Sequence, residues 1–188
     1  MEVEFVRSRF IKHFDGQTGN VYFSPGRINL IGEHTDYNGG FVFPGAVTQG
    51  VMAEVRPNGT NKVMAYSIDL KDRVEFDVDD QQGPKATWAR FIYGMVQEFR
   101  LLGVDVKGFN IAFAGDVPLG AGMSSSAAME GCFGCAVNDL FADNKISKWD
   151  IVLAGQATEH KYIGCNCGIM DQFASVFGEE GKLMRLDC

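Results

Sequence analysis

The order of secondary-structure signals along the chain strongly restricts the folds that it can adopt. Short β-prone runs dominate the first part, separated by turn residues, at positions 21–24, 41–43, 51–55, 63–66, 73–78 and 109–113. A further strand is expected at residues 182–187. Helical spacing of apolar residues prevails in the later part of the chain. Strands followed by helices, with no linker or internal repeat between them, predict a single α+β domain.

Three helices are expected in that later part. Apolar residues recur at i, i+3, i+4 and i+7 over residues 88–102, and Gly103 ends this amphipathic pattern. A second helix is expected over residues 124–141. A third is expected over residues 147–162, because the serine at its start and Asp150 three positions later form a capping pair.

Composition limits the classes of function. The chain has 188 residues, of which 46% are hydrophobic, and this is enough for one packed core. It carries 17 Lys and Arg against 24 Asp and Glu, a formal net charge of -7, which argues against a general nucleic-acid or anionic-membrane binder. The sequence shows neither a signal peptide nor an apolar stretch long enough to span a bilayer.

The five cysteines favour free thiols in a reducing compartment. Their odd number is not typical of a disulfide framework, so a cytoplasmic protein is expected. Cys132 and Cys135 have C-x-x-C spacing, and Cys165 and Cys167 have C-x-C spacing. The first pair lies within the predicted helix 124–141, and no second C-x-x-C or His pair lies at ligand spacing. Buried free thiols are therefore expected rather than a metal site.

A loop rich in Gly and Ser at residues 116–130 (DVPLGAGMSSSAAME) is the first segment that suggests chemistry. It follows the predicted strand 109–113 and leads into the predicted helix 124–141. Glycines let the backbone approach an anion, and the helix start and the serine hydroxyls donate hydrogen bonds, so the loop suits nucleotide phosphates. It is neither a P-loop nor a dinucleotide fingerprint. An ordinary loop that caps a helix fits the spacing equally well.

Charged residues crowd an apolar segment at residues 26–40 (GRINLIGEHTDYNGG). Isoleucine and leucine are interspersed there with Arg27, Glu33, His34 and Asp36. Charged groups beside core residues cost free energy unless they are paired or bind a ligand. Several acceptors so close together suit the hydroxyls of a sugar. A solvated turn between strands is the alternative interpretation.

Two acidic residues stand out in the segment at residues 159–173 (EHKYIGCNCGIMDQF). Glu159 lies near the end of a predicted helix, where the helix dipole disfavours a carboxylate, and this position suggests a compensating cation. Asp171 follows a glycine-containing turn and precedes the apolar run 173–177. The plainer role for Asp171 is that of a helix N-cap.

Together these segments resemble one enzyme family. Residues 26–40 closely resemble the galactokinase signature, and residues 118–128 (PLGAGMSSSAA) resemble the ATP-binding motif of the GHMP kinases. Residues 167–173 (CGIMDQF) resemble the galactokinase segment that carries the catalytic aspartate. The resemblance implies a GHMP-kinase N-terminal domain over residues 1–188, with a mixed sheet packed with helices. It also implies that a second domain, which packs on this one, is missing from the chain.

The resemblance further implies a kinase that uses Mg²⁺ and transfers the γ-phosphoryl group of ATP to the anomeric hydroxyl of galactose. By the same resemblance, Asp171 is the general base and Arg27 is its cationic neighbour. The residues implied for sugar binding are Glu33, His34, Thr35, Asp36, Gly168 and Asp171. Those implied for the ATP phosphates are Gly120, Ala121, Gly122, Met123, Ser124, Ser125 and Ser126. Those implied for Mg²⁺ are Ser126 and Glu159.

Two alternatives stay open at this point. One is a kinase of the same superfamily that acts on N-acetylgalactosamine, arabinose or mevalonate, although residues 33–37 (EHTDY) favour a sugar over mevalonate. The other is a non-catalytic sensor of galactose and ATP, but the intact segment 124–128, Glu159 and Asp171 favour an enzyme. Because the wall expected from a second domain is missing, residues 1–188 alone are expected to have little kinase activity.

Overall fold

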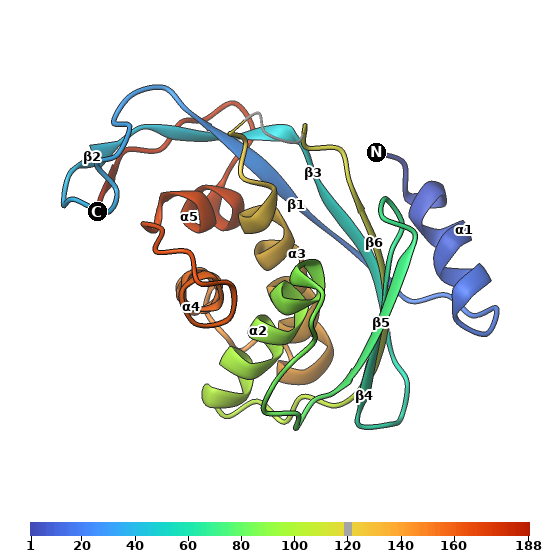
Figure 1. The fold of residues 1–188 in the computed structure, drawn as a ribbon. Coiled ribbons are helices and arrows are strands. Elements are labelled where there is room, and N and C mark those ends of the chain that lie inside the picture. Colours follow the sequence, from blue (N-terminus) through green and yellow to red (C-terminus); the bar gives the residue numbers. More distant parts are fainter. Residues whose placement is uncertain (119–121) are drawn as a thin grey trace.

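A five-stranded sheet forms the centre of the computed structural model, which describes residues 1–118 and 122–188 (Figure 1). In spatial order its strands are β1 (Asn20–Asn29), β3 (Pro44–Pro57), β6 (Phe109–Gly115), β4 (Lys62–Ser67) and β5 (Asp72–Asp77). β4 and β6 pair in parallel, whereas the other neighbours pair antiparallel. A separate pair consists of β2 (Phe41–Val42) and β7 (Leu186–Asp187). All the predicted strands are present, although β1 and β3 are longer than expected and the last strand is shorter.

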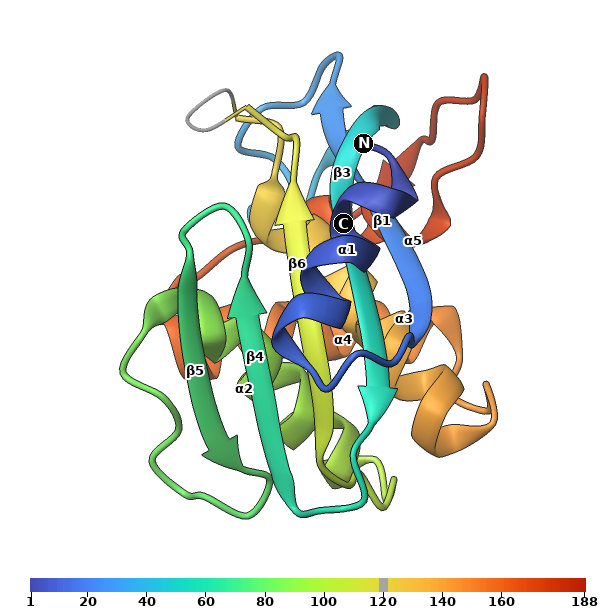
Figure 2. The ribbon, with the colours of Figure 1, turned by 90° about the vertical axis from the view of Figure 1, so that its right-hand side faces the viewer.

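Helices cover both faces of this sheet (Figures 1 and 2). The larger helical layer contains α2 (Thr87–Leu101), α3 (Ser125–Ala142), α4 (Lys148–Thr158) and α5 (Met170–Phe177). The opposite face is covered by α1 (Val3–His13), which contacts β3 and β6. The predicted α+β class is therefore confirmed. None of the helices in the described residues is long and apolar enough to cross a membrane.

The main hydrophobic core lies between the sheet and the larger helical layer. Its sheet side includes Val51 and Ile111, and its helix side includes Ile92, Phe99 and Phe133, all of them 3% exposed or less. The apolar spacing that predicts α2 thus corresponds to the face that α2 buries. Burial of this face holds α2 and α3 against the sheet and so fixes the start of α3, where the Gly- and Ser-rich loop ends.

The helix α1 is absent from the sequence-based prediction. Val6, Phe10 and Phe14 recur every four residues, are at most 1% exposed, and fill a second core between α1 and the sheet. A polar contact adds to this packing, because Arg7 Nε donates to the carboxylate of Glu54 at 3.3 Å. Glu54 lies on β3 and is fully buried. The first half of the chain is therefore not made of strands alone.

The third predicted helix ends earlier than expected. Its start is confirmed, since Ser147 caps α4 and its hydroxyl accepts a hydrogen bond from the N–H of Asp150 at 3.1 Å. The α-helix does not reach residue 162, because a π-helical turn, η1 (Glu159–Ile163), follows α4. Glu159 at the start of this turn is only 6% exposed. The hydrogen bonds of a π-helical turn span one residue more than those of an α-helix, and such turns are frequent at functional sites.

All five cysteines are free thiols. Cys132 is buried in α3 as expected, whereas Cys165 is exposed, because it lies in the loop after η1 and not in the core. The expectation of buried thiols is therefore wrong for Cys165. Among the described residues, no group of three or more His, Cys, Asp or Glu side chains is arranged to hold a metal ion.

Candidate active site

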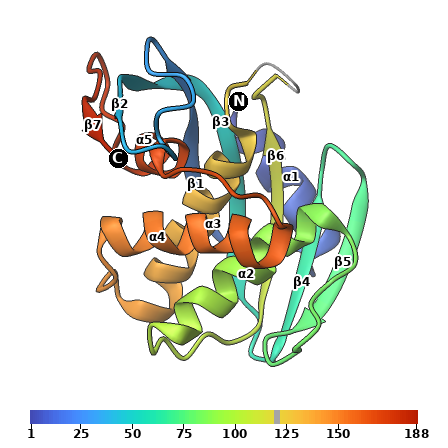
Figure 3. The ribbon, with the colours of Figure 1, turned by 60° about the vertical axis from the view of Figure 1, so that its left-hand side comes forward.

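A cleft of about 390 Å³ opens where β1, α5 and the loop before α3 meet. Figure 3 shows α5 beside α3 at this end of the molecule, near the β2–β7 pair. The lining of the cleft contains Arg27, Asn29, Glu33, His34, Asp36, Tyr37, Gly122, Cys167, Gly168, Met170 and Asp171. The fold thus brings together residues of the three segments selected from the sequence, which are far apart along the chain.

β1 places Arg27 beside the loop before α3. Gly26 allows this approach, because a Cβ atom at position 26 would lie 2.6 Å from the carbonyl oxygen of Met123. The backbone N–H of Arg27 donates to the same oxygen at 3.1 Å. A β-bulge between Pro25 and Arg27 shifts the register of β1 at this point. Bulges of this kind re-aim a side chain, here that of Arg27.

The side chain of Asp171 joins the cleft to that loop. Arg27 Nε donates to Asp171 Oδ1 at 2.7 Å, and Ser124 Oγ donates to Asp171 Oδ2 at 2.5 Å. The Arg27 guanidinium also donates to the carbonyl oxygen of Gly122. Asp171 lies in the first turn of α5, whose N-cap is Ile169, so the N-cap interpretation of Asp171 is wrong. Donors on both carboxylate oxygens fix the orientation of Asp171.

A second carboxylate, that of Asp36, lies close to Asp171. The backbone of Gly168 packs against it, and a Cβ atom at position 168 would lie only 2.2 Å from Asp36 Oδ2. Burial and the negative charge of Asp171 raise the pKa of Asp36, while the charge of Arg27 acts in the opposite direction. The cleft therefore presents two carboxylates and one guanidinium, a set of acceptors and donors that suits a ligand with several hydroxyls.

The loop between β1 and β2 presents further polar groups. Glu33 and His34 are exposed and line the cleft, and His34 Nδ1 forms a hydrogen bond with the hydroxyl of Tyr37. Thr35, also predicted for the site, does not line the cleft. Its hydroxyl donates to the carbonyl oxygen of Gly32 in the same loop at 2.6 Å, or to that of Phe41 at the start of β2 at 2.8 Å. Thr35 therefore braces the loop that carries Glu33, His34 and Asp36.

The loop before α3 leads to a helix start that can bind an anion. Ser124 has a left-handed φ of +55°, and Ser125 and Ser126 begin the helix. The described first turn of α3 contains no acidic residue. Because the first N–H groups of a helix have no acceptor within it, this turn attracts negative charge. Of the residues predicted around the phosphates, those outside the described part of the chain are Gly120 and Ala121.

Glu130 lies near two other acidic side chains, Glu159 and Asp171. Burial and the negative charges of Glu159 and Asp171 raise the pKa of Glu130. Within residues 1–118 and 122–188, neither Glu130 nor Glu159 forms an ion pair with Lys or Arg, although both are at least nine-tenths buried. Ser126 adds a hydroxyl oxygen at the start of α3. Carboxylate and hydroxyl oxygens without a counter-charge fit Mg²⁺, which takes one or two carboxylates together with phosphate oxygens.

Gln172, the neighbour of Asp171, holds Glu130 inside the protein. Gln172 Nε2 donates to Glu130 Oε2 at 3.0 Å, and both side chains are 2% exposed or less. Gly155 on α4 leaves room for this pair, since a Cβ atom there would lie 3.1 Å from Glu130 Oε2. Within the described chain, Glu130 Oε1 and Gln172 Oε1 have no hydrogen-bond partner. Burial is the main cause that raises the pKa of Glu130 well above the ordinary 4.5.

We expect Glu130→Gln to increase the free energy of unfolding at neutral pH by about 1–3 kcal/mol, the usual cost of a buried unpaired group. Folded protein binds the Glu130 proton more tightly than unfolded protein, so wild-type stability falls as the pH rises above 4.5 towards the raised pKa. Glutamine keeps the acceptor for Gln172 without a charge. The gain in free energy of unfolding from Glu130→Gln should therefore shrink towards about pH 4. Urea unfolding of both proteins across the pH range measures it.

Glu98 on α2 is a matched control, because it is also buried but has a counter-ion. It is 7% exposed and accepts hydrogen bonds from Lys161 Nζ at 2.9 and 3.0 Å and from the hydroxyl of Tyr162 at 2.8 Å. Glu98→Gln should lower the free energy of unfolding by about 1 kcal/mol, since Lys161 is partly exposed. If Glu130→Gln lost stability in the same way, that result would contradict the raised pKa of Glu130.

Four lining residues are outside the set predicted from the sequence: Asn29, Tyr37, Cys167 and Met170. Asn29 is the most informative of them. Its Oδ1 accepts a hydrogen bond from the N–H of Phe43 at 3.1 Å, while its buried Nδ2 has no partner among the described residues. Side chains two positions apart on a strand point to the same face. The spacing of Arg27 and Asn29 could therefore have indicated Asn29 as a site residue. Nδ2 of Asn29 is thus an additional donor at the cleft.

Two family models match the chain. One, described as "Galactokinase galactose-binding signature", matches residues 8–57, and the other, "GHMP kinases N terminal domain", matches residues 90–179. The chain is 44% identical to the galactokinase of Clostridium acetobutylicum, over 98% of this chain and 47% of that protein. It is also 44% identical to the galactokinase of Lactococcus lactis subsp. cremoris, over 92% of this chain and 45% of that protein. The chain spans about half the length of the curated relatives that it matches.

Solved structures are similar as well. The Lactococcus lactis galactokinase complexed with galactose has a TM-score of 0.92 and 40% identity, and the match covers 99% of this chain and 49% of that chain. The Methanococcus jannaschii mevalonate kinase has a TM-score of 0.73 and 17% identity, and that match covers 92% of this chain and 54% of that chain. At 17% identity the second likeness concerns the fold alone.

Proposed function

The chain belongs to the galactokinase family of the GHMP kinases, and on that premise we propose that it phosphorylates galactose as part of a longer enzyme. Its fold is that of a GHMP-kinase N-terminal domain, as the sequence predicts. In the proposed reaction, the γ-phosphoryl group of ATP passes to the anomeric hydroxyl of galactose. The products are galactose 1-phosphate and ADP.

The observation that carries this proposal is the contact of Asp171 with both Ser124 and Arg27. Ser124 precedes α3, whose first turn suits phosphates. Asp171 also lines the cleft beside Asp36, where acceptors suit sugar hydroxyls. The carboxylate of Asp171 therefore lies next to donors that suit phosphates and also next to acceptors that suit hydroxyls. Transfer from a phosphate to a hydroxyl depends on such adjacent, oriented sites.

Asp171 is the general base of the proposed reaction. It accepts the proton of the anomeric hydroxyl while that oxygen bonds to the γ-phosphorus and the bond to the bridging oxygen of ADP breaks. Arg27 holds the carboxylate in a fixed orientation by a charge-assisted hydrogen bond. The remaining sugar hydroxyls bind at Glu33, His34, Asp36 and the backbone of Gly168. Thr35 contributes indirectly, by bracing the loop.

The phosphates of ATP bind at the loop before α3, residues 120–126, and at the first N–H groups of that helix. Ser126 and Glu159 are the residues that would hold Mg²⁺, because their oxygens suit that ion and Glu159 is buried. When bound, Mg²⁺ neutralises negative charge on the phosphate oxygens. Ser124 stays bound to Asp171 and keeps the phosphate site aligned with the base.

Residues 1–188 form the ATP- and sugar-binding domain in this proposal, and a second domain completes the site. We refer to the longer protein as the full-length kinase. The chain alone should have little turnover, because phosphoryl transfer requires a closed site with its reactants in line. The free thiols of all five cysteines support a cytoplasmic location for the enzyme.

Asp36→Asn and Glu33→Gln test the sugar site. Each substitution removes one anionic acceptor at the cleft, and an unmatched polar group costs about 1–3 kcal/mol, or roughly 5- to 150-fold in Kd. We expect galactose binding to the full-length kinase to weaken by that factor, while ATP binding changes little. Isothermal titration calorimetry with galactose and with Mg–ATP, each alone, measures both affinities.

Asp15→Asn is the matched control for this experiment. Asp15 is exposed at the end of α1 with a left-handed φ of +55°, which asparagine adopts readily. The control should leave both affinities unchanged. Equal weakening of galactose and ATP binding by Asp36→Asn would indicate general destabilisation and would contradict the sugar site.

A further inference from the structure

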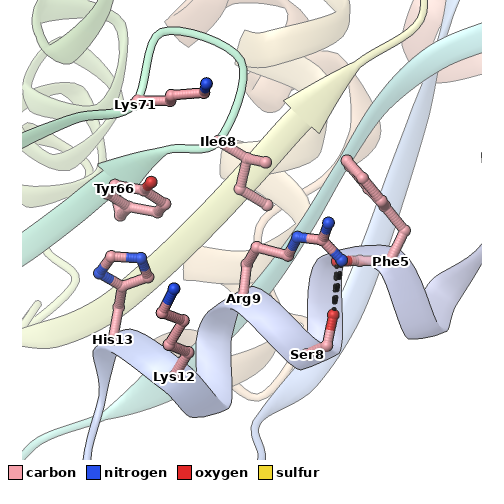
Figure 4. A pocket seen from close by; sticks show the side chains of 8 residues that line it. All are labelled: Phe5, Ser8, Arg9, Lys12, His13, Tyr66, Ile68 and Lys71. Atoms are coloured by element: carbon pink, nitrogen blue, oxygen red, sulfur yellow. Dashed lines mark hydrogen bonds between the residues drawn. The ribbon is translucent and has the colours of Figure 1, made fainter.

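A second cleft, of about 530 Å³, lies on the face of the sheet that α1 covers, opposite to α3 and α5. Figure 4 shows it from close by, with α1 along one side. The other side is formed by Tyr66 on β4 and by Ile68 and Lys71 in the turn after it. The proposed phosphoryl transfer makes no use of this cleft.

Three permanent cations border the cleft, Arg9 and Lys12 from α1 and Lys71 from the turn after β4 (Figure 4). Within the described part of the chain, none of the three forms an ion pair with a carboxylate. This concentration of positive charge occurs in a chain whose formal net charge is -7. Such a local field attracts anions to the cleft.

The acidic residues that flank Lys71 have partners outside the cleft. Asp69 Oδ2 accepts a hydrogen bond from the N–H of Gly115, at the end of β6, at 2.8 Å. Asp72 Oδ2 accepts one from the indole N–H of Trp88, on α2, at 2.9 Å. Within the described residues, neither carboxylate forms an ion pair with Lys71. The ammonium group of Lys71 is left to interact with a ligand.

The walls of the cleft combine aromatic and aliphatic groups. His13 stacks on Tyr66 with ring centroids 3.7 Å apart, and Ile68, which is 8% exposed, lies between α1 and Lys71 (Figure 4). The guanidinium of Arg9 lies 4.2 Å from the ring centroid of Phe5. Arg9 also donates to the hydroxyl of Ser8 at 2.9 Å, which holds it at the rim. An apolar wall beside fixed cations suits a small organic anion.

The imidazole of His13 already experiences this positive charge. Burial lowers its pKa from 6.5, and the charges of Lys12 and Arg73 lower it further. Arg73 lies on β5 and forms an ion pair with Glu75, with 3.4 Å between the guanidinium nitrogen and the carboxylate oxygen. An anion bound beside Lys12 would act on His13 in the opposite direction. His13 is therefore a site-specific reporter for the cleft.

We propose that this cleft binds a small phosphorylated compound, whose phosphoryl group contacts Arg9, Lys12 and Lys71 and whose organic part lies on Tyr66 and Ile68. A phosphoryl dianion is attracted by the three cations, and the planar guanidinium of Arg9 can donate two hydrogen bonds to its oxygens. The cleft volume is that of a site for a small molecule. This site is separate from the one at the start of α3.

Proton NMR of residues 1–188 with inorganic pyrophosphate, in a buffer without phosphate, tests the proposal. The chain has three histidines, so their imidazole Cε1–H signals are readily followed, and His13→Asn identifies the signal of His13. Saturating pyrophosphate should raise the pKa of His13 by about one unit, because a nearby anion favours the imidazolium. Pyrophosphate bound only at the start of α3 would leave His13 unchanged, so the outcome does not depend on the kinase function.

The double variant Lys12→Gln/Lys71→Gln should weaken pyrophosphate binding, measured at His13, by about tenfold. Lys85→Gln/Lys145→Gln is the matched control, since it removes the same charge from exposed positions outside the cleft. It should leave the binding curve unchanged. An unaltered pKa of His13 with pyrophosphate would overturn the proposal, and so would equal weakening by both double variants.

Discussion

Asp171→Asn in the full-length kinase should lower kcat by about 10² to 10⁴ at saturating galactose and ATP, the usual contribution of a general base. Asparagine has the size of aspartate, so the packing of α5 should be preserved. Its amide does not accept a proton from the sugar hydroxyl. Binding of ATP should change little, because asparagine keeps an acceptor for Ser124 and the phosphates bind mainly to backbone N–H groups.

A coupled assay of ADP release measures this kcat, and calorimetry with Mg–ATP measures nucleotide affinity. Asp143→Asn provides a matched control, because the Asp143 side chain is 85% exposed and, among the described residues, forms an ion pair with the nearby Lys145. The control should have the wild-type kcat. A near-normal kcat for Asp171→Asn at saturating substrates would mean that another group accepts the proton.

Arg27→Met is expected to lower kcat/KM by about 10- to 100-fold. The arginine joins Asp171 to the carbonyl oxygen of Gly122, so its loss leaves a carboxylate without its charge-assisted partner. Hydrogen bonds to charged groups contribute about 1.5–3 kcal/mol, and 1.36 kcal/mol corresponds to a tenfold change in rate. Methionine has a similar length and keeps most of the packing of the side chain.

Arg27→Lys separates the effect of charge from the effect of geometry. Lysine keeps the positive charge but does not donate through a planar fork. The kcat/KM of Arg27→Lys should therefore lie between those of wild type and Arg27→Met. Urea unfolding of each variant checks that the folded fraction is unchanged. If Arg27→Met had wild-type kcat/KM, the contact between Arg27 and Asp171 would have no part in the reaction.

Periodicity predicted most of the helices and strands, and its failures have local causes. The pattern over residues 88–102 predicted α2, because most apolar residues of that face belong to the main hydrophobic core. In α1, Val6 and Phe10 are fully buried, but Val3 and Phe5 are 39% exposed and blur the helical spacing. A helix whose apolar residues lie on two sides has no clear periodic signal.

The candidate site was predicted only in part, because much of it depends on contacts between distant segments. The loop of residues 116–130 has a local signal, since strand, glycines, serines and helix follow one another. The pair of Glu130 and Gln172 joins residues 42 positions apart and needs Gly155 on a third helix. No local pattern encodes such packing. The start of η1 at Glu159 depends on the same helices.

Thr35 shows a different limit of prediction from sequence. It stands between His34 and Asp36, which line the cleft, yet its hydroxyl lies within hydrogen-bonding distance of backbone carbonyls in its own loop and at the start of β2. Short polar side chains compete for backbone partners in this way, and the competition depends on loop geometry. A residue type and its neighbours therefore do not decide whether a side chain binds a ligand or supports the loop.

The central claim is that ATP and galactose meet at Asp171, with transfer to the anomeric oxygen. The most direct test is to incubate the full-length kinase with Mg–ATP and galactose labelled with ¹³C at carbon 1, and to record phosphorus and carbon NMR spectra of the product. The account predicts a new phosphomonoester whose phosphorus couples to the labelled carbon, together with one ADP for each ester formed. Phosphate on another carbon of the sugar, or release of ADP and inorganic phosphate without any sugar phosphate, would contradict it.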